Sequence, residues 1–343
     1  RLIDPADKEH VWPFDVGSEI HYTGRIISGA LWDLRKALIA KLGETEGRTT
    51  TDALFYQSMR NASDIPSMYV EVLAADDDDG DLQNGTPNGC EINQAFGTHG
   101  LRAMVVDSTP PAVVPATGEG YPIQLDVRGL IASCEGQGVE AVDVSWRLRD
   151  EPRTTQHLAM TGGPEHWEAT IPEQRPGDVV QYAVAVRLTD SPVVTVPQNR
   201  ADPMLEFFVG DVVPLYCTNF DTDPELDGWT HGLTSGTSVE GADDWQWDQP
   251  QGAPGSGDPS SPHTGTYAFG NDLGHGDFDG NYQADKVNFA LSPIIDTAGF
   301  DNVRLQYRRW LNVEDGYYDQ ATIYSNDEPV WTNFDSMAGE DSN

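Results

Sequence analysis

Cysteine is scarce in this chain, and its few copies are far apart. The sequence of 343 residues contains only Cys90, Cys134 and Cys217, and no Cys-x-x-Cys pair occurs. This spacing argues against a zinc knuckle or a redox motif. Three cysteines allow one disulfide with one thiol left over. We expect Cys217 to be the leftover thiol, with its partner beyond the end of the chain.

Positive charge is also in short supply. The chain has 20 Lys and Arg residues against 56 Asp and Glu residues, a formal net charge of −36. Such a surface repels nucleic acid and anionic membranes, so neither is an expected partner. It suits a secreted protein, a high-salt habitat or calcium binding. The 9 Trp, 12 Tyr and 11 Phe residues argue against a disordered acidic chain, which would be poor in aromatics.

Long apolar runs are missing as well. No run approaches the roughly 20 residues that a membrane-spanning helix requires, and no signal peptide is visible. The chain begins at Arg1 and ends at Asn343 in a polar stretch. We expect both ends to be cuts in a longer protein, so the missing signal says nothing about export. At this length two or three domains are expected.

The eight histidines form no helical zinc pair, because none are four residues apart, and His-Glu-x-x-His does not occur. We therefore expect no zinc ligand in this chain. His10 and His99 are interpreted as structural or surface groups. The histidines in regions with strand-like patterns are His157, His166, His231, His263 and His275.

Residues 1–101 are predicted to be helical. After Gly24, apolar side chains recur at helical spacing up to Leu42, and Gly43 is a natural end. The apolar residues of this first helix are Ile27, Leu31, Leu34, Leu38 and Leu42. Further helices are predicted over 51–59, 66–75 and 91–98. In the second of them we expect Leu54, Phe55 and Met59 to form the buried side.

The remainder is predicted to be β-structure. Residues 102–120 are rich in Pro and Gly and indicate a linker. Residues 121–212 switch to a period of two with regular turn signals, which predicts a fibronectin-like or immunoglobulin-like β-sandwich. Residues 215–343 resemble a jelly-roll accessory domain whose closing strands are missing.

Four aromatic residues of this last segment have two interpretations. Sandwich core is favoured, and a carbohydrate-binding or protein-binding platform is the alternative. The four residues are Trp245, Trp247, Tyr282 and Trp310.

Within the helical region, three features in order resemble the C-terminal subdomain of thermolysin-like and fungalysin-like metallopeptidases. The resemblance runs from about Asp15 to Leu101, under a third of the chain. It rests on His21-Tyr22-Thr23-Gly24-Arg25-Ile26-Ile27-Ser28, then Asp52-Ala53-Leu54-Phe55-Tyr56-Gln57 with Ser63-Asp64-Ile65-Pro66-Ser67 and Leu73-Ala74-Ala75-Asp76, and last Ile92-Asn93-Gln94-Ala95-Phe96-Gly97-Thr98-His99-Gly100-Leu101. The fold class that follows is a helical peptidase subdomain with two all-β sandwich domains after it.

The resemblance implies a catalytic role for His21. In that family, this histidine donates a hydrogen bond to the oxyanion of the tetrahedral intermediate, which stabilises charge that develops in the transition state. An upstream carboxylate orients its ring. Asp15 lies six residues before His21 and Glu19 two before, and neither matches the family spacing of five. We favour Asp15. The alternative for His21 is a loop histidine that forms a hydrogen bond near a helix start.

The acidic loop at 76–81 also has two interpretations. Calcium prefers several carboxylate and carbonyl oxygens that converge in a turn, and Asp77, Asp79 and Asp81 are the candidate ligands. The alternative is a solvated turn before the last helix, with acidic groups near its positive end. Asp243, Asp244, Asp277 and Asp279 raise the same question, and there we favour simple surface acidity.

Two functions follow from these patterns. The first is the C-terminal part of a secreted zinc endopeptidase acting on proteins or peptides, with every zinc ligand in a missing N-terminal half upstream of Arg1. The second is a non-catalytic extracellular structural or adhesive protein built on a degenerate peptidase subdomain. A carbohydrate-binding module is a third expectation, which rests on the jelly-roll pattern alone.

Overall fold

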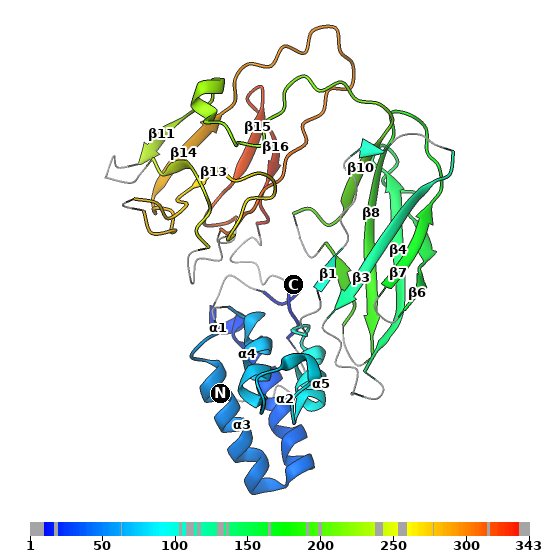
Figure 1. The fold of residues 1–343 in the computed structure, drawn as a ribbon, viewed down its shortest axis with the longest axis vertical. Coiled ribbons are helices and arrows are strands. Elements are labelled where there is room, and N and C mark those ends of the chain that lie inside the picture. The colour runs from blue at the N-terminus through cyan, green and yellow to red at the C-terminus, as the bar shows by residue number, and fades with distance from the viewer. Residues whose placement is uncertain are drawn as a thin grey trace. The chain divides into compact units, whose positions relative to one another are not determined.

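The computed structural model shows a chain in which helices come first and strands follow (Figure 1). It describes residues 10–16, 20–62, 64–102, 105–107, 113–114, 118–128, 134, 137–163, 166–189, 192–197, 201–236, 243–252, 259–276, 278–313 and 316–335. By its internal contacts the chain divides into one unit of residues 1–211 with 315–343 and a second of residues 212–314.

The helices occupy the first hundred residues. They are α1 (Ile20–Thr23), α2 (Arg25–Leu42), α3 (Glu44–Ser58), α4 (Ser67–Asp76) and α5 (Gly89–Thr98), with a 3-10 turn η1 (Leu82–Asn84). Gly43, at φ 86°, is the single residue between α2 and α3. Glycine readily adopts this left-handed backbone, which lets the chain reverse direction between the two helices.

The bounds of α2 confirm the predicted first helix. The fully buried side chains are Ile26, Ala30, Leu34 and Leu38, while Ile27 and Leu31 pack against this core from its edge. The apolar stripe is therefore wider than the sequence pattern indicated. The helices predicted over 66–75 and 91–98 also form, shifted by one or two residues at an end.

The predicted buried side of the second helix is wrong in two of its three residues. Leu54 is buried, but Phe55 and Met59 are exposed, and α3 begins at residue 44 rather than 51. Most of the buried residues of this helix are small. A Cβ added at Gly47 would lie 2.5 Å from the Ile39 Cα, so α3 can approach α2 closely only because glycine stands there.

Strands of two sheets follow the helices. The first sheet has the order β1 (Val105–Asp107), β3 (Tyr121–Arg128), β7 (His166–Ile171), β6 (Thr161–Gly162). The second has the order β2 (Val113–Val114), β10 (Leu205–Val209), β8 (Val179–Leu188), β4 (Val139–Leu148), β5 (Gln156–Ala159), and β9 (Val194–Val196) also pairs with β8. Two of these strands, β1 and β2, lie in the segment expected to be a linker.

Side chains from both sheets form one hydrophobic core. Leu125 and Ile171 from the first sheet, and Val184, Tyr182 and Phe207 from the second, all have almost no exposed surface. Their alternation along each strand is the period of two seen in the sequence. The period of two predicted for residues 121–212 is confirmed by β3, β4, β7 and β8.

Among the described residues beyond 212, the strands pair two by two. They are β11 (Thr230–Gly236) with β14 (Lys286–Leu291), β12 (Trp245–Asp248) with β13 (Ala268–Asn271), and β15 (Thr322–Ser325) with β16 (Glu328–Thr332). A short 3-10 turn, η2 (Pro224–Asp227), precedes β11.

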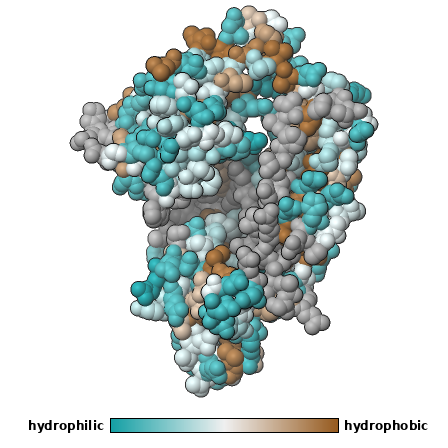
Figure 2. Space-filling view, in the orientation of Figure 1, coloured by the Kyte–Doolittle hydropathy of each residue, from teal (hydrophilic) through white to brown (hydrophobic). Residues whose placement is uncertain are grey.

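The predicted fold class, a helical subdomain followed by two all-β sandwich domains, is therefore wrong. The chain is a mixed α and β structure with several small sheets. A sandwich needs two sheets that cover each other's apolar faces. In β14 the apolar residues Val287, Phe289 and Leu291 are all at least 40% exposed, and no second sheet covers them among the described residues. Figure 2 shows hydrophobic residues exposed at several places among hydrophilic ones on this face of the molecule.

Residues 303–310 illustrate the same failure. They lie in the segment predicted to be a jelly-roll domain, but they form no strand in the structure. Trp310 is 66% exposed, so its interpretation as core is wrong. Trp245 is half-buried, and its ring centroid lies 5.1 Å from that of Phe269.

Of the described helices, none is long and apolar enough to cross a membrane.

Candidate functional site

His21 lies on α1, a helix of four residues that Gly24 separates from α2. Its side chain is exposed. The neighbouring Tyr22 is held from two sides: the Arg25 guanidinium lies 5.7 Å from the centre of its ring, and the His10 ring meets it edge-on at 4.7 Å. These contacts fix the residue next to His21 while leaving His21 accessible.

Asp15, expected to orient His21, has a backbone partner. Its Oδ2 accepts a 2.7 Å hydrogen bond from the Val11 N–H, and its own N–H donates to the Val11 carbonyl at 2.8 Å. The carboxylate therefore closes the turn at residues 11–15. Glu19, the other candidate, lies outside the described residues.

His99 was interpreted as a structural or surface group, and its burial confirms the structural interpretation. It is 2% exposed, with Nδ1 2.7 Å from the His10 carbonyl oxygen and Nε2 3.2 Å from Asp33 Oδ2. Its carbonyl accepts the Trp12 N–H at 2.9 Å. The ring thus fastens the segment before α1 to α2 and α5. Gly29, a glycine inside α2, leaves the space that the His99 ring fills, because a Cβ there would lie 2.5 Å from the His99 Cε1.

The acidic loop gathers three carboxylates at its exposed end. Oxygens of Asp77, Asp78 and Asp79 lie within 4.8 Å of one another. Asp79 accepts hydrogen bonds from the Asn84 amide at 2.7 Å and from the Asp81 N–H at 3.0 Å. The Asn84 bond is the main reason that the pKa of Asp79 is lowered. Of the three predicted ligands, Asp77 and Asp79 come together, and Asp78 takes the place expected for Asp81.

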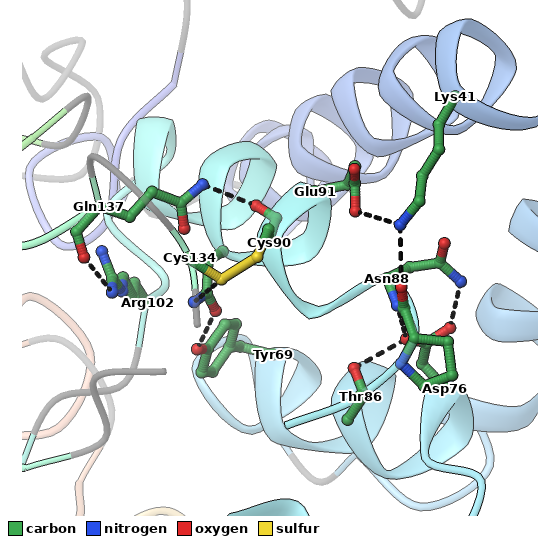
Figure 3. Close-up of a disulfide and its surroundings, with 12 residues drawn as sticks. Lys41, Tyr69, Asp76, Thr86, Asn88, Cys90, Glu91, Arg102, Cys134 and Gln137 are labelled. Carbon is green, nitrogen blue, oxygen red and sulfur yellow. Dashed lines mark hydrogen bonds and ion pairs between the residues drawn. A yellow bond between two sulfur atoms is a disulfide. The ribbon is translucent and has the colours of Figure 1, made fainter. Parts of the chain in front are cut away.

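Asp76, the last residue of α4, clamps the same loop from inside (Figure 3). Its Oδ2 accepts from the Thr86 hydroxyl at 2.7 Å and the Asn88 N–H at 2.6 Å, and its Oδ1 from the Asn88 amide at 2.6 Å. Asn88 precedes α5, so this buried carboxylate lies at the positive end of that helix. Lys41 adds a second tie by donating to the Pro87 carbonyl at 2.8 Å.

One disulfide joins Cys90 on α5 to Cys134 (Figure 3), while Cys217 is an exposed free thiol. This confirms the prediction of one bridge with a cysteine left over. A partner of Cys217 outside the chain stays a prediction. Beside the bridge, the Tyr69 hydroxyl donates to Asn93 Oδ1 at 2.6 Å.

Surface acidity is the wrong interpretation for Asp244, which is fully buried and ion-paired with Lys286. Asp243 and Asp279 are exposed, and Asp277 lies outside the described residues.

Zinc does not fit the described residues. The one group of His, Cys, Asp or Glu side chains that could share an ion among them is the carboxylate cluster at 77–79. Zinc sites are built mainly from His nitrogen and Cys sulfur, whereas clustered carboxylate oxygens suit calcium.

Comparisons with known proteins do not assign this chain to a family. No protein-family model matches the chain, and no curated protein matches it either. Its similarity to solved structures is weak. The Br derivative of BhCBM56 is 13% identical over 31% of this chain and 92% of its own, with a TM-score of 0.20. CopC from Methylosinus trichosporium OB3b is 20% identical over 33% and 100%, with a TM-score of 0.22. Murine CRIg is 15% identical over 32% and 99%, with a TM-score of 0.20. Likeness at this level carries no argument about fold or function.

Proposed function

We propose that this chain supplies part of the active site of an extracellular zinc-dependent endopeptidase, with His21 as the oxyanion donor. The observation that carries the proposal is the position of His21. Its side chain is exposed on α1, and the next helix in the sequence, α2, is anchored by buried apolar side chains that include Ile26 and Leu34. A donor must be held rigidly before the reaction in order to stabilise charge that appears only in the transition state.

The chemistry derived for these residues is limited to one hydrogen bond. An imidazole N–H of His21 would donate to the carbonyl oxygen of a bound peptide as that oxygen gains negative charge. The bond strengthens as the charge develops, so it lowers the barrier rather than tightening substrate binding. The zinc ligands of such an enzyme belong, in this proposal, to a preceding catalytic half that is not in this sequence.

Two features support an extracellular location. The Cys90–Cys134 disulfide persists best in an oxidising compartment. The net charge of −36 keeps the chain away from nucleic acid and anionic lipid. Calcium on the 77–79 carboxylates stays a proposal of the same kind, supported by their mutual distance.

The alternative is a non-catalytic extracellular structural or adhesive protein. The partner of Asp15 favours it, because that carboxylate closes a backbone turn through Val11. A degenerate active site that kept its scaffold and lost its orienting acid would show this arrangement.

The test is peptide hydrolysis by the native protein with His21→Phe. Loss of one oxyanion donor is expected to lower kcat by about 100-fold to 1,000-fold with KM nearly unchanged. His157→Phe, which replaces another exposed histidine, is the matched control and should retain activity. Equal activity of the wild type and His21→Phe would contradict the proposal, and absence of any hydrolysis by the wild type would favour the structural alternative.

A further inference from the structure

A second buried carboxylate lies in the 212–314 unit, immediately after β13. Asp272 is 2% exposed. Its Oδ1 accepts the N–H groups of Gly274 at 3.2 Å and Gly280 at 2.7 Å. Its Oδ2 is also buried, and no residue that the structure describes forms a hydrogen bond with it. A buried carboxylate oxygen left in this way costs free energy unless a cation or a donor compensates it.

The neighbouring Asp244 shows how the same unit compensates a buried carboxylate fully. It forms an ion pair with Lys286 and accepts the side-chain amides of Asn271 at 2.9 Å and Asn288 at 2.6 Å. The two aspartates are in direct contact, since the Asp272 N–H donates to the Asp244 carbonyl at 2.8 Å. Lys286 is thus committed to Asp244. Within the described part of the chain, Asp272 has no cation of its own.

Described residues on both sides of position 277 converge on this carboxylate. Gly274 and Gly280 donate to the same oxygen from opposite ends of the turn, and both have left-handed backbone, at φ 78° and 86°. The Gln246 side chain secures the turn from β12. Its Oε1 accepts the Leu273 N–H at 2.7 Å, and its Nε2 donates to the His275 carbonyl at 3.1 Å. The turn is therefore held in shape without an ion.

We propose that Oδ2 of Asp272 binds a calcium ion. Oxygens of the described residues 272–276 and 278–280 would complete its coordination. Calcium accepts irregular sets of oxygen ligands, which a turn of this kind offers. Zinc is a poor fit, because the His275 ring in this turn already has Nδ1 3.2 Å from Asp248 Oδ2 and Nε2 2.6 Å from the Gln249 carbonyl. The overall negative charge adds a favourable field for a divalent cation.

The first test is calcium titration of the full chain by calorimetry, comparing wild type with Asp272→Asn. Asparagine keeps the oxygen that accepts from the two glycines and replaces the charged Oδ2 by an amide. Calcium affinity at this site should fall by roughly tenfold or more. Asp296→Asn is the matched control, because Asp296 is exposed and accepts the Ala298 N–H at 2.9 Å. An Asp272→Asn protein with wild-type affinity and stoichiometry would overturn the inference.

A second test separates this site from the acidic loop at 77–79 and works even if Asp272→Asn misfolds. Terbium replaces calcium, and its emission is sensitised only by an aromatic ring close to the ion. Trp245 pairs with Asn271 in the β12–β13 ladder, next to Asp272, and Trp245→Phe removes no hydrogen bond among the described residues. Trp-excited emission should drop in Trp245→Phe and persist in Asp77→Asn/Asp79→Asn. The reverse pattern would assign the ion to the acidic loop and sink the proposal.

Discussion

At the residue scale, the helical region depends on polar side chains buried in specific pairings. Asp76 has both carboxylate oxygens occupied by donors of the loop that it closes. His99 lies between a carbonyl and a carboxylate and fills the space that Gly29 leaves. Such groups are costly to leave unsatisfied, so single substitutions at them should have large and measurable effects.

Asp76→Asn should lower the free energy of unfolding by about 1–3 kcal/mol, because an amide NH₂ would face the donors that the carboxylate now accepts. Urea denaturation monitored by circular dichroism measures this change. Asp78→Asn in the exposed part of the same loop should stay within about 0.5 kcal/mol of wild type. Equal stabilities of the two variants would show that the clamp contributes little.

Gly29→Ala should destabilise the protein by roughly 1–3 kcal/mol, since the new methyl group would overlap the buried His99 ring. Gly138→Ala is its control, because no atom lies within 4 Å of a Cβ placed there. Thermal unfolding of both variants gives the comparison. A neutral Gly29→Ala would mean that His99 does not occupy this space.

The raised pKa of Tyr69 predicts a loss of stability at alkaline pH. Burial raises its pKa from 10.0 to about 12. The unfolded chain therefore releases this proton first as pH rises, so the stability present below pH 10 should decline between pH 10 and 12. Tyr69→Phe should flatten the decline, whereas Tyr56→Phe, at an exposed tyrosine, should not. Parallel declines in wild type and Tyr69→Phe would refute the assignment.

At the scale of elements, the disulfide is the strongest single constraint on the helical region. It joins α5 to a residue 44 positions later, between β3 and β4. Closing a loop of this length is worth roughly 3–4 kcal/mol through restriction of the unfolded chain.

Cys134→Ser should therefore lower the free energy of unfolding by about 2–5 kcal/mol. Denaturation with and without reductant measures it: reductant should destabilise the wild type and leave Cys134→Ser unchanged. Cys217→Ser should behave as wild type, since that thiol is free and exposed. A wild type insensitive to reductant under unfolding conditions would show that the bridge is absent.

The elements themselves were largely predictable from the sequence, because their patterns are local. Gly24 and Gly43 bracket α2, and the period of two marked β4 and β8. The length of α3 was not predictable from apolar spacing, because small residues such as Gly47 and Thr51 make up much of its buried line. The partner of each strand was not predictable either, since alternation identifies a face and not what covers it.

The candidate site was predictable only in part for the same reason. The exposed position of His21 before a long helix follows from the local pattern. The backbone partner of Asp15, the clamp by Asp76 and the burial of Asp272 depend on contacts between distant segments. Sequence spacing does not contain that information.

At the scale of the whole molecule, the chain combines strong negative charge, one disulfide and small sheets beyond residue 212 that leave apolar side chains exposed. The predicted jelly-roll domain is wrong at this scale, because it depends on which strands pair and on which sheet covers the apolar face of another. The proposed peptidase role also belongs to this scale, because His21 can contribute to hydrolysis only alongside zinc ligands that the described residues do not provide.

The most direct test is the intact mass of the native protein measured together with its zinc content. The peptidase proposal predicts a mass above 37.5 kDa, upstream peptides containing His-Glu-x-x-His, and about one zinc ion per chain. A mass of 37.5 kDa with no zinc would contradict it and leave the structural or adhesive function in its place.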